Sequence, residues 1–107
     1  MNIPVTMAHD EVPRKALVKI GDLKGGIQTV NDAFIEPGKS FTPHTHYDCE
    51  EFYYFLEGDG ILKINKTEYP ITEGDFVIIS VGDEHSVTNT GKKKLRYLTV
   101  RYKIKDC

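Results

Sequence analysis

The chain has 107 residues, with 14 Lys and Arg against 16 Asp and Glu, so its formal net charge is −2. This length predicts one domain, residues 1–107, and the balanced charge excludes the basic surface typical of nucleic-acid binding. No apolar run has transmembrane length and no signal peptide is visible, so we expect a cytoplasmic protein that contacts neither nucleic acid nor membrane.

The first third of the chain predicts an extended arm followed by two strands. Residues 1–13 contain two prolines among mixed polar residues and are expected to form an N-terminal arm. His9 in this arm could serve as an extra ligand or a lid, but an exposed histidine is far commoner. Residues 14–20 alternate modestly in polarity and residues 27–35 are extended, so both segments are predicted strands.

The middle of the chain predicts an extended segment, a turn and an unusually apolar strand. Pro43 favours an extended backbone before it, within residues 41–46, and residues 47–49 turn the chain. The strand at residues 51–56 is apolar on both faces, one with Glu51, Tyr53 and Phe55, the other with Phe52, Tyr54 and Leu56. A covered outer face is therefore expected, either beneath the N-terminal strands or in a homodimer, which we favour.

The last part of the chain predicts short strands separated by turns. Strands are expected at residues 61–65 and 68–71, joined at residues 66–67, then a buried strand at 76–80 and further strands at 85–89 and 95–104. No segment has a helical apolar period. Many short strands with turn residues between them indicate an all-β barrel or jelly roll.

Three of the four histidines lie between residues 38 and 89. Residues two apart on an extended chain point the same way, so His44 and His46 can converge on one ion. Glu51 follows, and His85 must come from another strand. Glu50 is the nearest rival to Glu51, but neighbours on a strand face opposite sides, so only one can bind. Imidazole and carboxylate together suit Fe, Mn, Ni, Cu, Co or Zn.

The two histidine-containing segments resemble the two motifs of the cupin superfamily. The first segment, residues 38–58, supplies Gly38, His44, His46, Glu51 and Gly58. The second segment, residues 74–89, supplies Gly74, Gly82, His85 and Asn89. Ser80 stands where the family usually has proline, which affects a turn and not a ligand. The resemblance implies a double-stranded β-helix, or jelly-roll barrel, with one divalent transition metal per chain (Fe, Mn, Ni or Zn) held by His44, His46, Glu51 and His85.

The resemblance also implies a small-molecule ligand and two kinds of function. One is a small metal-dependent enzyme of dioxygenase, isomerase or decarboxylase type. The other is a non-catalytic binding barrel with a structural metal, because four protein ligands fill a tetrahedral zinc ion but leave two positions on octahedral iron, manganese or nickel. No nucleophile–base pair accompanies the motifs, so the catalytic residues stay unknown and any chemistry is expected to be metal-centred. The residues expected to line the cavity and contact substrate are Tyr53, Phe55, Phe76 and Val87.

The two cysteines do not indicate a disulfide framework. Cys49 lies inside the first motif and Cys107 is the last residue, so we expect no pairing between them. Cys49 is interpreted as a passive turn residue, although a thiol so near a metal site is liable to oxidation.

Overall fold

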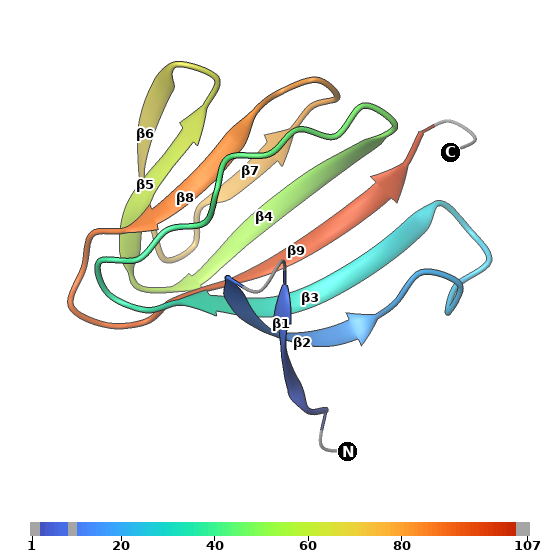
Figure 1. Ribbon diagram of the computed structural model, residues 1–107, viewed down its shortest axis with the longest axis horizontal. Helices are drawn as coiled ribbons and strands as arrows, with labels where there is room; N and C mark the ends of the chain where they lie inside the picture. Colours follow the sequence, from blue (N-terminus) through green and yellow to red (C-terminus); the bar gives the residue numbers. More distant parts are fainter. Residues whose placement is uncertain (1–2, 9–10, 105–107) are drawn as a thin grey trace.

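The structure of the protein is a computed structural model that describes residues 3–8 and 11–104. These residues form nine strands and no helix (Figure 1). The strands are β1 (Val5–Ala8), β2 (Val12–Val18), β3 (Ile27–Ile35), β4 (Cys49–Glu57), β5 (Asp59–Ile64), β6 (Thr67–Thr72), β7 (Phe76–Ile79), β8 (His85–Asn89) and β9 (Leu95–Lys103). Within the described ranges no helical segment has the length and hydropathy of a membrane span.

The strands form two antiparallel sheets. The larger has the order β1-β2-β3-β9-β4-β7 and the smaller has the order β6-β5-β8 (Figure 1). Every pairing is antiparallel, and several neighbours are distant in sequence, as between β3 and β9. This arrangement confirms the predicted all-β double-stranded β-helix.

The core lies between the sheets and takes side chains from both. Phe55 and Leu95 of the large sheet and Leu62 and Val87 of the small sheet are fully buried. Burying each of these side chains contributes about 1.5–3 kcal/mol relative to leaving it exposed. The predicted alternation along β4 is confirmed, because Tyr53 and Phe55 are buried while Tyr54 between them is exposed.

The turn between β4 and β5 requires glycine. Gly58 has φ of 93°, a region that only glycine enters without strain. A Cβ atom at this position would also lie 2.6 Å from the carbonyl oxygen of Lys94. The last glycine of the first motif therefore lets β4 turn into β5 directly against the chain that enters β9.

Several predicted boundaries differ in the structure. Residues 5–8 of the expected arm form strand β1, paired antiparallel with β2. The second strand is shifted toward the N-terminus, covering residues 12–18 instead of 14–20, and Ile20 is 67% exposed beyond its end. The hairpin connection is Asn65–Lys66 and not residues 66–67, because Asn65 adopts the positive φ, 53°, that the tight turn needs. His9 lies outside the described residues.

The segment at residues 41–46 is not a strand of either sheet. It is held by isolated bridges, between Ser40 and Thr88 and between His44 and His85. Pro43 has no N–H to donate to a ladder, which is why a continuous pairing does not form here. The segment nevertheless crosses close to β8 (Figure 1).

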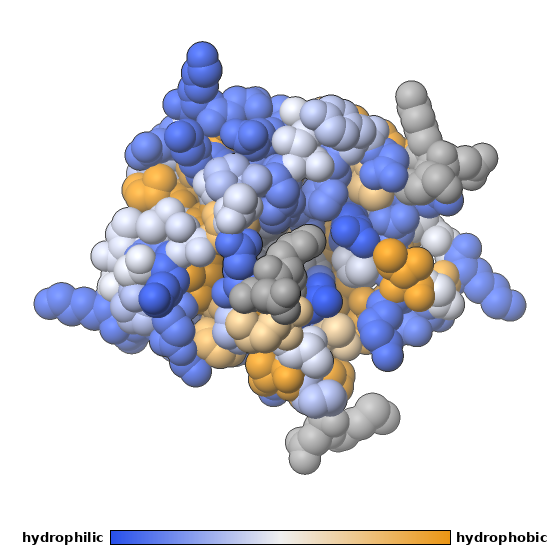
Figure 2. Space-filling model, viewed as in Figure 1, coloured by the Kyte–Doolittle hydropathy of each residue, from blue (hydrophilic) through white to orange (hydrophobic). Residues whose placement is uncertain are grey.

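Strand β7 is not buried as its composition predicted. Phe76 is 53% exposed and Ile78 is 60% exposed, while Ile79 is buried. Both exposed residues pair with the outward face of β4, where the Phe52 and Phe76 rings lie 5.2 Å apart. The prediction failed because apolar composition does not reveal whether a strand's second apolar face is covered. The face of the molecule shown in Figure 2 is mostly hydrophilic, with hydrophobic residues in separate patches.

Candidate metal centre

The four residues of the expected ligand set meet at one point between the sheets. One possible ligand atom from each of His44, His46, Glu51 and His85 lies within 4.8 Å of the other three. Glu51 comes from β4 of the large sheet and His85 is the first residue of β8 in the small sheet. His44 and His46 come from the connection between β3 and β4. The cluster therefore joins three separate parts of the fold.

Backbone hydrogen bonds hold the histidine segments in register. The N–H of His44 donates to the carbonyl of His85 at 3.1 Å, and the N–H of His85 donates to the carbonyl of His44 at 3.0 Å. The N–H of Gly82 donates to the carbonyl of His46 at 2.8 Å. Gly82 adopts φ of 85°, which brings the turn before β8 against the first motif.

The orientation of two imidazole rings is set by backbone carbonyls. Nδ1 of His44 lies 3.3 Å from the carbonyl of Thr42, and Nδ1 of His85 lies 3.2 Å from the carbonyl of Asp83. A carbonyl oxygen can only accept, so in each ring Nδ1 carries the proton and Nε2 keeps its lone pair. This is the arrangement by which outer hydrogen bonds orient metal-binding histidines.

Burial and neighbouring charges keep His44 and His46, the two partly exposed histidines of the cluster, neutral. Burial lowers the pKa of His44, and the neighbouring His85 lowers it further. Burial also lowers the pKa of His46, outweighing the opposite effect of Glu51, and Arg101 adds to the lowering. Metal ligands must be deprotonated imidazoles, so both rings are in the ligand form at neutral pH.

Two buried polar atoms in the cluster lack hydrogen-bond partners among the described residues. These atoms are Oε1 of Glu51 and Nε2 of His85. They lie 3.3 Å apart, and Nε2 of His46 lies 3.8 Å from the same carboxylate oxygen. Buried polar atoms in folded proteins nearly always have a partner. Three imidazole nitrogens and one carboxylate oxygen gathered at one point fit a divalent transition metal.

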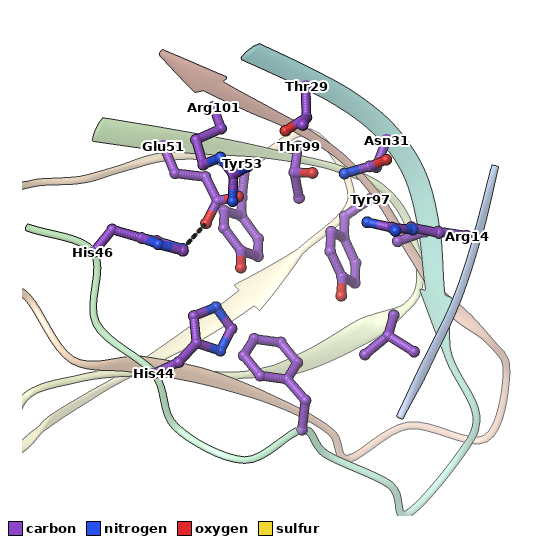
Figure 3. A pocket seen from close by; sticks show the side chains of 13 residues that line it. Arg14, Thr29, Asn31, His44, His46, Glu51, Tyr53, Tyr97, Thr99 and Arg101 are labelled. Atoms are coloured by element: carbon purple, nitrogen blue, oxygen red, sulfur yellow. Dashed lines mark ion pairs between the residues drawn. The ribbon is translucent and has the colours of Figure 1, made fainter. Parts of the chain in front are cut away.

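A cavity of about 90 Å³ adjoins the cluster. Its walls come from the inward faces of β2, β3, β4 and β9, together with Phe41 and the two histidines of the connection (Figure 3). His44, His46 and Glu51 line it, whereas His85 is fully buried behind them. Three of the four residues of the cluster are thus open to the cavity.

Two tyrosines occupy the middle of the cavity wall. The rings of Tyr53 and Tyr97 are stacked, with centroids 5.2 Å apart and planes 15° apart. Burial raises the pKa of Tyr53 well above its usual value, and the charge of Glu51 raises it further. The pKa of Tyr97 is raised by the same two causes in the same order. Both phenols therefore stay protonated and neutral.

Of the four residues predicted to contact substrate, Tyr53 lines the cavity, and Phe55, Phe76 and Val87 do not. Tyr53 lines the cavity as expected. Phe55 and Val87 are fully buried in the core and are not among the lining residues. Phe76 does not line the cavity either, since it lies on the outward face of the large sheet. Apolar composition marked these residues, but the register of β4, β7 and β8 decides which of them meets the cavity.

Sequence reasoning missed five polar residues that line the cavity, which are Arg14, Thr29, Asn31, Thr99 and Arg101. Asn31 lies two residues from Thr29 on β3, and Arg101 lies two residues from Thr99 on β9, so each pair shares the inward face of its strand. Arg14 of β2 also lines the cavity. A signal existed, because polar residues on an inward strand face mark a cavity, but it requires knowing which face points inward.

Cys49 is the first residue of β4 and not a turn residue. It is buried, and its Sγ lies 2.9 Å from Oε1 of Gln28 and 3.1 Å from Oδ1 of Asp48, so its single S–H proton is shared between these two acceptors. The same Gln28 oxygen accepts a hydrogen bond from Nε of Arg101 at 3.1 Å. Cys49 therefore supports the position of a cavity arginine. Cys107 lies outside the described residues.

Curated relatives match most of this chain but only part of their own length. An uncharacterized protein of Methanocaldococcus jannaschii is 32% identical over 79 residues, covering 74% of this chain and 63% of that protein. An oxalate-binding protein of Thermotoga maritima is 38% identical over 66 residues, covering 62% of this chain and 54% of that protein. The chain therefore spans less than two thirds of either relative.

Solved structures share the fold over nearly the whole chain. A crystal structure described as a predicted oxalate decarboxylase from Thermotoga maritima has a TM-score of 0.89 at 26% identity, covering 96% of this chain and 95% of that one. A cupin 2 conserved barrel domain protein from Salinispora arenicola has a TM-score of 0.76 at 18% identity, covering 97% and 90%. The family model described as the cupin domain matches residues 32–101, which include both motifs. This chain belongs to the cupin domain family.

Proposed function

We propose that this protein binds one divalent transition metal per chain through His44, His46, Glu51 and His85 and holds a small organic acid beside it in the barrel cavity. The observation that carries this proposal is that three of the four residues line the cavity. A metal held there would act as a Lewis acid toward a carboxylate or carbonyl oxygen. Iron, manganese, nickel and zinc all accept this donor set.

The open side of the cluster argues against a purely structural site. A structural zinc site is closed by four protein ligands on all sides. Here the buried His85 closes one side, while the other three residues border a cavity that a ligand oxygen can enter. The chain thus supplies both the ligand set and the space for an exogenous group next to it.

The charge of the cavity favours an acid as ligand. Arg14 and Arg101 line it, and Glu51 is the one acidic residue among its lining residues. The two guanidinium groups remain positive at any physiological pH. Relatives of this chain are named as an oxalate-binding protein and a predicted oxalate decarboxylase, which supports a carboxylate ligand here.

Two functions are consistent with such a complex. One is metal-dependent turnover of the dioxygenase, isomerase or decarboxylase type, in which Tyr53 and Tyr97 donate hydrogen bonds to the bound molecule. The other is binding without turnover. The raised pKa values of both tyrosines keep the phenols protonated, so in either case they can donate hydrogen bonds to a bound carboxylate. Binding is common to both functions and is therefore proposed first, with turnover to be tested on it.

The decisive experiment has two steps. Metal content is measured by plasma mass spectrometry on protein purified without chelator or nickel resin, and about one equivalent per chain is expected. Oxalate and other small acids are then titrated calorimetrically into the loaded protein, and the same mixtures are assayed for product. A folded protein that takes up no metal, or a loaded protein that binds no carboxylate, contradicts the proposal. Product formation moves the assignment from binding protein to enzyme.

We also propose that residues 1–107 form one cupin domain that assembles as a homodimer through the outward face of the large sheet. Phe76, Ile78 and Tyr54 are exposed side by side on β7 and β4. Exposed apolar groups of this size gathered on one sheet face are typical of association surfaces. Dimer formation through this face would remove them from water.

A further inference from the structure

The side of the cavity away from the metal cluster carries two polar residues that the proposed metal site does not use. Arg14 of β2 and Asn31 of β3 point into the cavity opposite His46, with the two tyrosines between (Figure 3). Nε of Arg14 and Oδ1 of Asn31 are buried and have no hydrogen-bond partner among the described residues. Such atoms in a cavity wall indicate that a ligand supplies the partner.

The strand register explains how these residues face the cluster across the cavity. Arg14 pairs with Ala33 on β3, Ala33 pairs with Tyr97 on β9, and Tyr97 pairs with Phe55 on β4. Three strand spacings, about 14 Å along the sheet, therefore separate the β2 and β4 backbones. The side chain of Arg14 covers part of this distance, because it points back into the cavity toward Tyr97 (Figure 3). Phe55 lies four residues along β4 from Glu51, so Glu51 and Arg14 mark the two ends of a diagonal across the inward face of the sheet.

Charges in the cavity wall distinguish the two ends. Arg101 lies beside the cluster, opposite Glu51 in the β4–β9 register, and its Nε is already bonded to Gln28. Among the described residues that line the cavity, Glu51 is the one acidic residue. Asp32, next to Asn31, pairs with Arg96, at 2.7 Å. The described lining at the far end of the cavity therefore carries the positive charge of Arg14 without a carboxylate beside it.

We propose that Arg14 and Asn31 form a second carboxylate subsite, so that the cavity takes a small dicarboxylate. One carboxylate lies at the metal cluster, as in the proposed function on which this inference rests, and the other accepts hydrogen bonds from Arg14 and Asn31. The amide of Asn31 turns by 180° to offer its nitrogen as a donor, since the two ends of an amide are interchangeable in shape. Hydrogen bonds from a guanidinium to a carboxylate are among the strongest available to a protein.

The cavity volume limits the ligand to a short chain. At about 90 Å³ the cavity is well below the roughly 300–1,000 Å³ of sites for drug-sized ligands. A dicarboxylate with few carbons fills it, whereas a sugar acid or an aromatic diacid exceeds it. The class of ligand is therefore a short, unbranched diacid.

The test compares succinate with butyrate, which have the same number of carbons and differ by one carboxylate. Both are titrated calorimetrically into the metal-loaded 107-residue protein. We expect the wild type to prefer the diacid by about tenfold or more, the effect of one charge-assisted hydrogen bond. In Arg14→Gln this preference should fall to about twofold or less, because the diacid loses much more affinity than the monoacid does.

A neighbouring lysine offers a matched control. Lys15→Gln removes the same charge from the same strand, but Lys15 is exposed on the opposite face, so the diacid preference should persist. Asn31→Ala should also reduce the preference, which tests the subsite without altering Arg14. Metal content and melting temperature are measured for every variant, so that only folded, loaded proteins are compared.

The outcomes separate this inference from the proposed function. Equal binding of diacid and monoacid by the wild type overturns the second subsite and leaves the proposed function standing. A diacid preference that survives in both Arg14→Gln and Asn31→Ala also overturns the assignment of these residues. Absence of metal, or absence of any carboxylate binding, overturns the proposed function and the subsite together.

Discussion

The backbones of His44 and His85 hydrogen-bond to each other in both directions, at 3.1 and 3.0 Å. One residue belongs to the first motif and the other to the second, so the two motifs are joined at their proposed ligands. Because peptide groups make this connection, the positions of both side chains are set without help from an ion. We therefore expect the ligand geometry to be preformed, with single side-chain changes that leave the fold intact.

Replacement of His46 should separate metal binding from folding. Its ring is half-buried at the cavity wall, and His46→Ala leaves the backbone hydrogen bond from Gly82 in place. We expect the variant to retain less than a full equivalent of metal after dialysis and to keep the circular dichroism spectrum of the wild type. Retention of one full equivalent would remove His46 from the ligand set.

Tyr53→Phe is the matched control for that experiment. The change removes a hydroxyl group from the cavity wall but none of the four proposed ligands, so one equivalent of metal should remain. Its melting temperature without metal should also stay close to that of the wild type. Loss of metal from this variant would show that the phenol, and not only Glu51, takes part in the coordination.

The metal-free protein should lose stability in mildly acidic solution. Burial lowers the pKa values of His44 and His46 below the ordinary 6.5. The unfolded chain therefore binds protons at a higher pH than the folded protein does, so the free energy of unfolding decreases as the pH falls through 6.5 toward the lowered values. Thermal melts between pH 8 and pH 5 should show this decrease, with a shallower slope in His46→Ala. A melting temperature that rises over this interval would contradict the prediction.

Gly58→Ala should be strongly destabilising. The new methyl group would combine a φ of 93° with an approach of 2.6 Å to the carbonyl of Lys94. We expect a loss of about 2–4 kcal/mol in the free energy of unfolding, since backbone strain of this kind costs about 1–3 kcal/mol before the clash is added. Denaturant titration measures it. Gly25→Ala, where nothing lies within 4 Å, should change stability by less than about 1 kcal/mol.

Asn89 should prove structural. Its buried amide donates to the carbonyls of Ile35 and Lys93, at 2.8 and 2.7 Å, and accepts from the N–H of Gly91 at 2.9 Å. Asn89→Ala leaves these two carbonyls and the N–H of Gly91 without the Asn89 side chain as a partner. It should lower the free energy of unfolding by about 2–4 kcal/mol. The same change at Asn31, whose Oδ1 has no partner among the described residues, should lower it by less than about 1 kcal/mol. Equal losses at the two positions would refute the fastening role of Asn89.

A charge on the outward sheet face should break the proposed dimer. Ile78 is 60% exposed on β7, so Ile78→Lys should fold but place a lysine in an apolar interface. Light scattering at micromolar concentration should give twice the 12.2 kDa chain mass for the wild type and the monomer mass for the variant. Leu23→Lys alters an exposed side chain in the connection between β2 and β3 instead, and its mass should match that of the wild type. A monomeric wild type would rule the dimer out.

The predictable and unpredictable parts of the molecule differ for physical reasons. The extended pattern of residues 27–35 predicted β3 with the bounds the structure has, and alternation put Tyr53 and Phe55 on one face of β4, which is the inward face. The resemblance to the cupin motifs implied the set of His44, His46, Glu51 and His85, which lie together in the structure, and their role as ligands stays a prediction. Strand β7 was different, because Phe76 and Ile78 on one side and Val77 and Ile79 on the other are all apolar. Only the pairing with β4 decides which side meets the core.

Arg14 shows a second limit. Its strand begins at Val12, two residues before the predicted start, and a bulge between Ala16 and Val18 interrupts the register. A long cationic side chain in such a strand has no local feature that marks it as inward. The pairing of β2 with β3, and of β3 with β9, determines that Arg14 faces the cavity.

The ligand set is unevenly distributed along the chain, and this affects how an ion would couple to folding. His44, His46 and Glu51 are near neighbours in sequence, whereas His85 arrives only when the small sheet docks. A denatured chain still contains the short chelating run, so it competes for the ion at reduced affinity. The increase in stability on metal addition should therefore be smaller than the native affinity alone implies. The ion stabilises the native state only by the part of its binding free energy that comes from His85 and from the ordering of the first motif.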